Sequence, residues 1–343
     1  MSFQNDKYLL RPADSSDNDG IRAIFESESF RGNLDVKFLR NPAPYESFAA
    51  DGEMAKVIVA VERATNRIVA VGGAVIRREF VHGRKERCAY LTGLKVHPEY
   101  RRKFIYLKQA YAELYEHIKD CPFKYTTVLD SNVDAIRMFE KKRKNMPTYT
   151  YLGHYTTYCF HGGCRKIQIE KDHMDGFQEL LDRHFSKQSL VPCDYEYKGF
   201  GKKHFYCVRK DNEIVACCFV GDQQETKQYK MCSYGGMLKM VSHFPTKLFG
   251  YPVFPKPDSV INHGVISYLY VKENDKKLCQ DFLQSVAAES PFSLLLWGGF
   301  ENNPLSSVLD EMKTIKYGSR LYSVDWEGET EIQGVIGMEA AVL

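Results

Sequence analysis

Hydrophobic and polar positions in the first 160 residues alternate between a period typical of strands and one typical of helices. Runs rich in β-branched and aromatic residues predict strands over 8–11, 57–62, 68–76, 89–96, 125–129 and 149–160. Apolar residues spaced three and four apart predict helices over 18–26, 104–119 and 132–141. The second of these helices places Tyr111 and Tyr115 on its apolar face, where core packing is the favoured role for both. This order predicts an α/β unit, a mixed sheet flanked by helices.

The second half of the chain repeats the same order of elements. We expect strands over 166–170, 205–209, 214–220, 265–271, 292–297 and 319–326, and helices over 174–184, 276–289 and 305–312. Short local matches support a duplication: Asp19-Gly20-Ile21 with Asp175-Gly176-Phe177, residues 66–70 with 212–216, and Asn132 with Asn303. The alternative is coincidence among common α/β elements.

The length of 343 residues suits two such units. We predict a first domain over 1–160, a second over 165–330 and a tail over 331–343. The tail carries no charge after Glu339, so it either packs against a domain or frays. The segment 245–257, with four prolines, is expected to form an extended loop.

Charge and cysteine usage narrow the function classes. The net charge is +3, from 47 basic and 44 acidic residues, and so small an imbalance argues against a dedicated nucleic-acid binder. The 10 cysteines form no CxxC pair and the 10 histidines form no HxxxH pattern, so no metal is expected. An acid precedes any apolar run at the N-terminus and no stretch is long enough to span a membrane. We therefore expect a cytoplasmic protein with reduced thiols.

Two motifs carry a family resemblance. The first runs from Leu91 to Lys103, LTGLKVHPEYRRK, and the second from Asp130 to Lys141, DSNVDAIRMFEK. Together they resemble the GNAT superfamily of N-acetyltransferases. The resemblance covers residues 6–160 by motif and 165–327 by element order alone, and it implies two tandem acyl-CoA N-acyltransferase-like domains.

The resemblance implies acetyl-CoA as co-substrate and a set of residues that contact it. The strand with Leu94 and Val96 would lie beside the pantetheine arm, and Asn132 and Phe139 of the second motif would lie near it. The pyrophosphate would rest on the loop of Arg101, Arg102, Lys103, Phe104, Ile105 and Tyr106. Physics independent of the family supports this site, because free N–H groups and the helix dipole attract anions at a helix N-terminus.

Three positions depart from the family pattern. Phe104 and Tyr106 stand where the family has small residues, although three adjacent cations would still attract phosphate. Phe139 stands where the family has a tyrosine acid, and phenylalanine cannot donate a proton. Tyr90 stands where some relatives carry a carboxylate base. The catalytic residues are therefore unknown, and the nearby Glu79, Glu86 and Glu99 are interpreted as solvated surface charges.

The second copy lacks a clear cofactor motif. Its corresponding loop, 272–277, has no glycine, and Asp275 looks like a helix N-cap. Gly298-Gly299 would permit a close backbone approach or mark a turn or bulge. We expect this copy to be structural or to help wall the acceptor site. The basic run 141–144 suits either a helix C-terminus or an anionic partner.

The leading functional hypothesis, as the resemblance implies, is acetyl transfer from acetyl-CoA to an amine on a small molecule or peptide. The alternative is a non-catalytic relative that uses the same site to bind a ligand or partner, because neither copy shows a complete acid/base set. The acceptor and the oligomeric state stay open.

Overall fold

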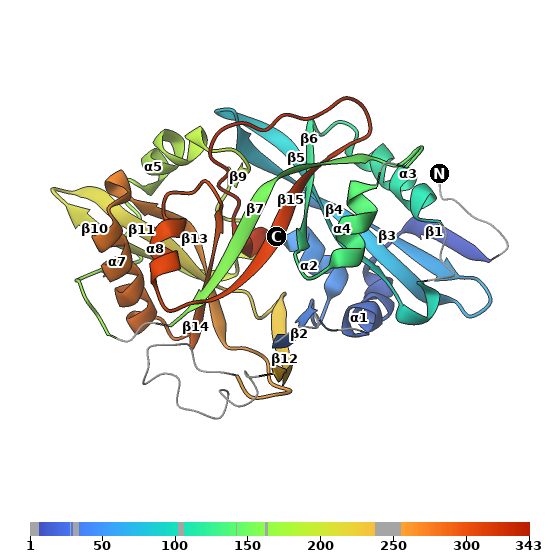
Figure 1. Cartoon of the computed structure of the whole chain (residues 1–343), viewed down its shortest axis with the longest axis horizontal. Helices are drawn as coiled ribbons and strands as arrows, with labels where there is room; N and C mark the ends of the chain where they lie inside the picture. Colours follow the sequence, from blue (N-terminus) through green and yellow to red (C-terminus); the bar gives the residue numbers. More distant parts are fainter. Residues whose placement is uncertain are drawn as a thin grey trace.

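The structure is a computed structural model that describes residues 7–27, 29, 34–101, 106–141, 143–161, 164–236 and 255–343. Its first half contains β1 (Tyr8–Pro12), α1 (Asn18–Glu26), β2 (Leu34–Leu39), α2 (Pro44–Ala50), β3 (Met54–Glu62), β4 (Arg67–Val81), β5 (Arg84–Val96), α3 (Leu107–Ile118), β6 (Phe123–Leu129), α4 (Val133–Glu140) and β7 (Thr148–Phe160). Its second half contains β8 (Glu170–Lys171), α5 (Phe177–Arg183), β9 (Val191–Pro192), β10 (Lys202–Lys210), β11 (Glu213–Asp222), β12 (Gln228–Tyr234), β13 (His263–Val271), α7 (Lys276–Glu289), β14 (Leu294–Phe300), α8 (Ser306–Glu311) and β15 (Ile315–Asp325). Figure 1 shows the two halves on either side of the long strands β7 and β15.

One sheet of 13 strands runs through both halves, in the order β1-β3-β4-β5-β6-β15-β7-β14-β13-β11-β10-β8, with β9 beside β4. The two halves exchange one strand each. Strand β15 of the second half lies between β6 and β7 of the first half, and β7 of the first half pairs with β14 of the second. The sheet therefore does not divide at residues 160–165, because each half borders a strand from the other. The division into domains over 1–160 and 165–330 stays a prediction.

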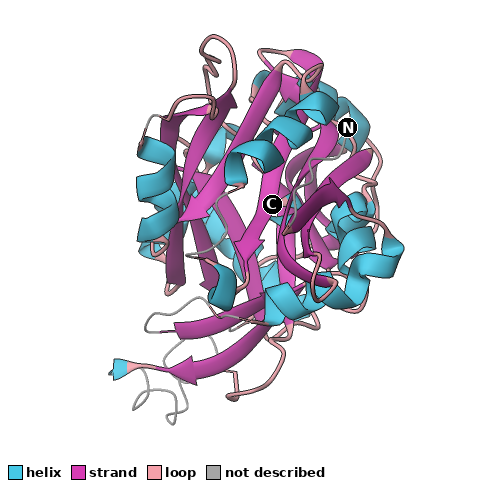
Figure 2. Ribbon diagram, turned by 90° about the vertical axis from the view of Figure 1, so that its right-hand side faces the viewer, coloured by secondary structure: helices cyan, strands magenta, loops and turns pink. Residues whose placement is uncertain are grey.

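Helices cover both faces of this sheet (Figure 2). In the first half, α1 and α2 bury Ile21 and Phe48 against one face, while α3 buries Leu114 against the other. In the second half, α5 packs through Phe177 on one face, and α7 packs through Phe282 on the other. Each such side chain contributes about 1.5–3 kcal/mol when fully buried, which explains why the apolar periodicity predicts α1, α3, α5 and α7.

The fold class predicted from the sequence is confirmed, and most elements lie where expected. The helices 18–26 and 276–289 have the predicted bounds. The strand expected over 166–170 is wrong in extent, because β8 is a two-residue edge strand at Glu170–Lys171. The sequence pattern did not predict β2, α2 or β12. Most of the expected loop over 245–257 lies outside the described residues.

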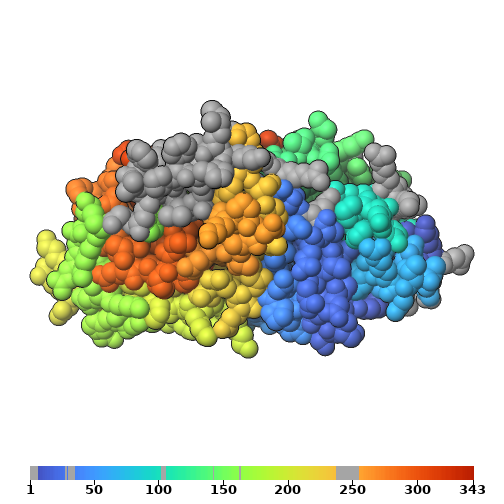
Figure 3. Space-filling model, turned by 90° about the horizontal axis from the view of Figure 1, so that it is seen from below, coloured from blue at the N-terminus to red at the C-terminus, as the bar shows by residue number. Residues whose placement is uncertain are grey.

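Strands β2 and β12 form a separate antiparallel ribbon that joins the two halves. The ribbon pairs Leu39 with Gln228 and Leu34 with Tyr234. Seen from below, the first half, in blue, and the second, in yellow and orange, lie side by side along the long axis (Figure 3). The ribbon and the exchanged strands tie the halves together at their seam.

Candidate functional site

The first candidate site is a gap between two neighbouring parallel strands. Strands β5 and β6 pair only from Cys88 with Phe123 to Leu91 with Thr126. Beyond that point β5 continues to Val96 and β6 to Leu129 without pairing to each other. We call this gap the first splay. Past Leu91 and Thr126, the facing edges of the two strands form no ladder with each other.

A bulge in β5 turns further main-chain groups away from the sheet. The pairing of β5 with β4 jumps from Thr92 opposite Gly73 to Lys95 opposite Val71, so Gly93 and Leu94 have no partner in that register. Gly93 has φ +70°, and a Cβ there would lie 2.6 Å from the Phe48 ring. Only glycine meets both conditions without strain. Leu94 is 42% exposed beside the splay.

Only the two ends of the predicted phosphate loop, Arg101 and Tyr106, lie within the described residues. Arg102, Lys103, Phe104 and Ile105 fall outside the described residues, so their role stays a prediction. Arg101 is exposed immediately before this segment, and Tyr106 is the N-cap residue of α3. The Tyr106 ring contacts the Tyr8 ring edge-on at 5.5 Å between centroids and packs against the same cluster as Val96.

The two predicted cofactor residues of α4 have structural partners. The Asn132 side chain accepts a hydrogen bond from the Ala135 N–H at 3.2 Å and caps the helix. The Phe139 ring stacks on Tyr149 at 4.1 Å between centroids and meets Tyr322 edge-on. Tyr149 donates in turn to the Tyr111 hydroxyl at 2.6 Å, and burial raises the pKa of Tyr149 well above its usual range. Phe139 is therefore part of an aromatic core beneath α4.

The two tyrosines interpreted as core residues of α3 both pack against the sheet. Tyr111 is 7% exposed, and Tyr115 stacks on Trp326 at 4.8 Å between ring centroids. Neither is placed to replace the missing acid of the family pattern.

Glu79 corrects one expectation from the sequence. The surface interpretation is wrong for this residue, which is fully buried and accepts hydrogen bonds of 2.6 Å from Arg77 Nε and the Tyr125 hydroxyl. The alternation of Arg77 and Glu79 within an apolar strand was the available signal, because residues two apart share one face of a strand. Glu86 is half-buried and Glu99 is exposed.

A second gap of the same kind exists between β13 and β14. These parallel strands pair only from His263 with Leu294 to Val265 with Leu296. The register of β13 with β11 jumps between Ser267 and Tyr270, and Tyr268 there has φ +51°. This second splay repeats the backbone of the first, with a tyrosine in the left-handed conformation where the first has Gly93.

Comparison with known proteins gives one family match and several structures of the same fold. The family model described as "Acetyltransferase (GNAT) family" matches residues 21–143, which include the first splay. This match, over about a third of the chain, supports membership in the GNAT superfamily. None of the curated proteins matches the sequence. The match also supports acyl transfer as the general class of reaction.

Solved structures with the same fold include single-chain proteins of similar length. The chain is similar to a GCN5-related N-acetyltransferase from Sphaerobacter thermophilus, with TM-score 0.58 and 11% identity, over 96% of this chain and 99% of that one. It is also similar to Saccharomyces cerevisiae N-myristoyltransferase with bound myristoyl-CoA, with TM-score 0.61 and 11% identity, over 95% and 81%. A third, a GCN5-related N-acetyltransferase from Anabaena variabilis, gives TM-score 0.52 and 10% identity, over 92% and 72%.

The second splay is occupied by the protein's own C-terminal tail. The Glu339 carboxylate accepts a hydrogen bond of 2.9 Å from the Tyr268 N–H, the group that the bulge turns away from the sheet. The Met338 carbonyl accepts from the Tyr155 hydroxyl at 3.1 Å. Of the two alternatives for the tail, packing is confirmed. In the second splay, the main-chain N–H of Tyr268 at the bulge is therefore bonded by the protein's own tail.

The tail also contacts the first half of the chain. Arg77 Nη1 donates to the Val342 carbonyl at 2.6 Å, and Lys227 Nζ donates to the Ala341 carbonyl at 2.7 Å. Lys227 and Arg40 both pair with Asp51, at 2.7 and 3.2 Å, and all three side chains are at most 3% exposed. Burial lowers the pKa of Lys227 to about 8 in spite of Asp51. The tail and these buried charges fix the seam between the halves.

Three residues singled out in the second half of the sequence, Gly298, Gly299 and Asp275, have structural roles. Gly298 and Gly299 lie inside β14, where the Tyr155 and Trp297 side chains leave no room for a Cβ, so they allow close approach and form no turn. The Asp275 side chain accepts from the Leu278 N–H at 2.9 Å and caps α7, as predicted.

Tyr90 is a polar residue close to the point where β5 and β6 separate. Its hydroxyl shares a hydrogen bond of 2.7 Å with Thr127 Oγ1, and the residue is 4% exposed. Burial raises the pKa of Tyr90, so its hydroxyl keeps its proton at neutral pH. On the same strand, burial lowers the pKa of Lys95 to about 8, and its ammonium donates to the Phe25 carbonyl at 2.8 Å.

Two kinds of feature are missing from the described part of the chain. Within it, no group of three or more metal-binding side chains comes together. Its helices also include none with the length and apolar character that a membrane span requires.

Proposed function

We propose that the protein is an N-acyltransferase that moves an acetyl group from acetyl-CoA to an amine, with the cofactor in the first splay. The observation that carries this proposal is the bulge at Gly93 and Leu94, which faces the gap between β5 and β6. The second splay has the same bulge but is filled by the tail. This contrast favours the first splay as the acyl-CoA site.

The chemistry needs few groups from the protein. A neutral amine attacks the thioester carbonyl directly, and a main-chain N–H of the bulged segment between Gly93 and Val96 holds the developing oxyanion. The cations Arg101, Arg102 and Lys103 at the start of α3 attract the phosphates. Leu94 and Val96 flank the pantetheine arm in this proposal, and Tyr106 closes the loop.

The Tyr90 hydroxyl is the proposed proton donor to the leaving thiolate. It lies one residue before the last paired position of β5 and is protonated at neutral pH. Phe139 cannot take this role, because it has no proton to give and is packed against Tyr149.

The alternative is a non-catalytic GNAT protein that binds a ligand in the same place. The observation in its favour is that both predicted cofactor residues of α4 already have structural partners. The Phe139 ring stacks on Tyr149, and the Asn132 side chain caps the helix. This alternative predicts binding of an acyl-CoA without release of CoA.

Thermal unfolding with acetyl-CoA separates the possibilities. A ligand at 100 times its Kd stabilises a protein by about 2.7 kcal/mol, so we expect a clear rise in Tm with millimolar acetyl-CoA. Butyryl-CoA and myristoyl-CoA, run in parallel, test the acyl chain length. If none of the three acyl-CoA compounds raises the Tm, both the acyltransferase proposal and the binding alternative are wrong.

Catalysis is then measured as release of free CoA thiol with a panel of amines and peptides. Tyr90→Phe should lower kcat at least tenfold while the acetyl-CoA Tm shift persists, since only the proton donor is lost. Binding without thiol release across the panel would favour the non-catalytic alternative.

A further inference from the structure

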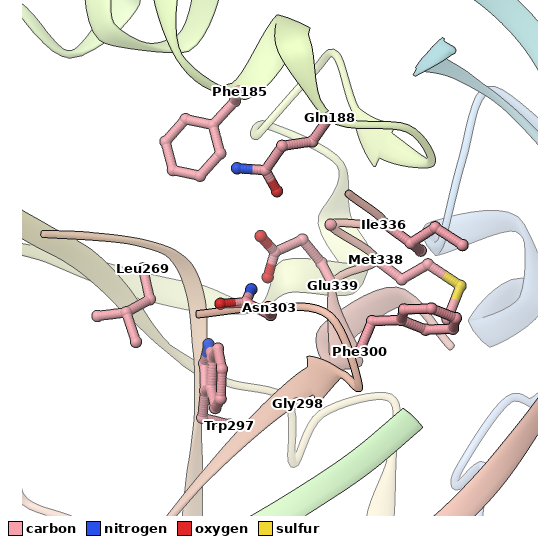
Figure 4. A pocket seen from close by; sticks show the side chains of 11 residues that line it. Phe185, Gln188, Leu269, Trp297, Gly298, Phe300, Asn303, Ile336, Met338 and Glu339 are labelled. Carbon is pink, nitrogen blue, oxygen red and sulfur yellow. The ribbon is translucent and has the colours of Figure 1, made fainter. Parts of the chain in front are cut away.

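A pocket lies in the second splay, between the tail and strand β14. Its walls include Phe185, Gln188, Trp297, Asn303 and Glu339. Figure 4 shows the Glu339 carboxyl group in the middle of this pocket, directed toward the Gln188 amide. The pocket is separate from the first splay, so a ligand bound in it is independent of acyl transfer.

Two acceptor oxygens in the pocket lack donors among the described residues. Glu339 is 7% exposed, and its Oε1 accepts from the Tyr268 N–H, while no described residue donates to its Oε2. Gln188 uses its Nε2 on His184 Nε2 at 3.3 Å, and no described donor reaches its Oε1. No described lysine, arginine or histidine forms an ion pair with Glu339. An ionised carboxyl group buried without a counter-charge costs free energy, and either a proton or a bound cation removes that cost.

The remaining walls suit a small cation. The rings of Trp297 and Phe185 border the same space as the two oxygens. A group with several N–H donors and a positive charge would therefore satisfy both oxygens and contact the rings.

We propose that this pocket binds a small primary ammonium group, either the ammonium ion or a short alkylamine, between Glu339 Oε2 and Gln188 Oε1. Trp297 and Phe185 bound the site and restrict its size. Gly337 belongs to the site because a side chain there would overlap Gln188 Oε1.

Binding is linked to the protonation of Glu339. Burial raises the pKa of this carboxyl group to about 8, so without a cation it keeps its proton at neutral pH. The titratable groups that face it are Tyr155, Tyr268 and Cys218, whose pKa values burial raises well above their usual ranges. None of these groups is charged near pH 8. A bound ammonium group displaces the proton, and its affinity rises with pH up to about 8.

Trp297 provides the signal that tests the site. The chain has two tryptophans, so a Trp326→Phe background leaves Trp297 as the single reporter. We would titrate ammonium chloride against sodium chloride at equal ionic strength, and methylammonium chloride in a third arm. We expect a saturable fluorescence change with ammonium that is absent with sodium, and an affinity up to about tenfold tighter at pH 8 than at pH 7, because one proton is displaced. Retention of binding by methylammonium would assign the site to alkylamines, and its loss to the ammonium ion.

Two variants in that background test the residues. Glu339→Gln keeps an acceptor for the Tyr268 N–H but removes the negative charge, so it should weaken ammonium binding at least tenfold. Glu331→Gln is the control in the same tail, because Glu331 is exposed, and it should leave ammonium binding unchanged. Gln188→Leu removes the second acceptor without touching the carboxyl group. The proposal is wrong if ammonium gives no saturable change, if sodium gives the same one, or if Glu339→Gln and Gln188→Leu both bind as tightly as the parent.

Discussion

The two splays have the same backbone plan and different contents. Each is made by two parallel strands that pair over three or four residues and then separate beside a bulge. In the first, the bulge carries Gly93, and Leu94 is 42% exposed; in the second, it carries Tyr268, and Leu269 is 8% exposed. The backbone geometry is thus shared, while side chains and the tail decide which splay stays available.

The largest expected effect comes from the arginine that links the tail to the first half. Arg77→Met leaves Glu79 buried without its cation, which should cost about 3–5 kcal/mol of unfolding free energy. Chemical denaturation measures this loss. Arg78→Met on the same strand is the control, because Arg78 is 62% exposed and pairs with Glu53 at the surface. Equal losses in both variants would contradict a special role for the buried pair.

Next in size is the pH dependence that Glu339 brings to the second splay. Its pKa is raised from 4.5 to about 8 by burial, so the folded state binds an extra proton between these values. Stability should therefore fall as pH rises from about 4.5 to about 8, by at most about 1.4 kcal/mol per pH unit from this group. Glu339→Gln should flatten that slope in denaturant midpoints measured across the range. An unchanged slope would contradict the burial of Glu339.

A smaller expected effect is the loss of stability when a side chain is added at the first bulge. Gly93→Ala places an alanine in a left-handed conformation and against the Phe48 ring. It should lower the free energy of unfolding by about 1–3 kcal/mol and weaken acetyl-CoA binding. Gly83→Ala is the matched control, since Gly83 has φ +78° and no atom within 4 Å of a Cβ. It should lose stability by strain alone and keep its acetyl-CoA Tm shift. Similar binding by the two variants would weaken the assignment of the first splay.

The smallest effect compares the two helix caps. Asn132→Ala and Asp275→Ala each remove one side-chain bond to a helix N-terminus, and each should cost about 1 kcal/mol. Only the Asn132 variant should also change the affinity for acetyl-CoA, because only its splay is proposed to bind it. Calorimetric titration of both variants tests this, and a matching loss in the Asp275 variant would break the distinction.

The sequence predicted the regular elements well because their apolar periodicity is set by burial on one face. α1 and α7 have their predicted bounds for that reason. Strands β2 and β12 were missed although both alternate polar and apolar residues, as in Leu34-Asp35-Val36-Lys37-Phe38. The two strands pair with each other across more than half of the chain, and local patterns carry no information about such a partner.

Side-chain roles at the site were harder to predict than elements. The motif from Leu91 to Val96 lies in β5, and the family match includes it. The burial of Glu79 was not predicted. Arg77 supplies its counter-charge and the Tyr125 hydroxyl donates a hydrogen bond to it, and these groups enclose it only after β4, β5 and β6 assemble. The cap formed by Asn132 and the stacking of Phe139 likewise depend on contacts that spacing alone does not define.

The sequence by itself determined the α/β class and the motif that resembles the GNAT superfamily, since both follow from local periodicity and a contiguous stretch of residues. The tertiary structure alone decided that β7 and β15 change places, that the tail enters the second splay and that Glu339 meets the N–H freed by the bulge at Tyr268. The physical reason is that these features arise from pairing between segments far apart in the chain. Their free energy comes from burying main-chain and charged groups together, which no single segment encodes.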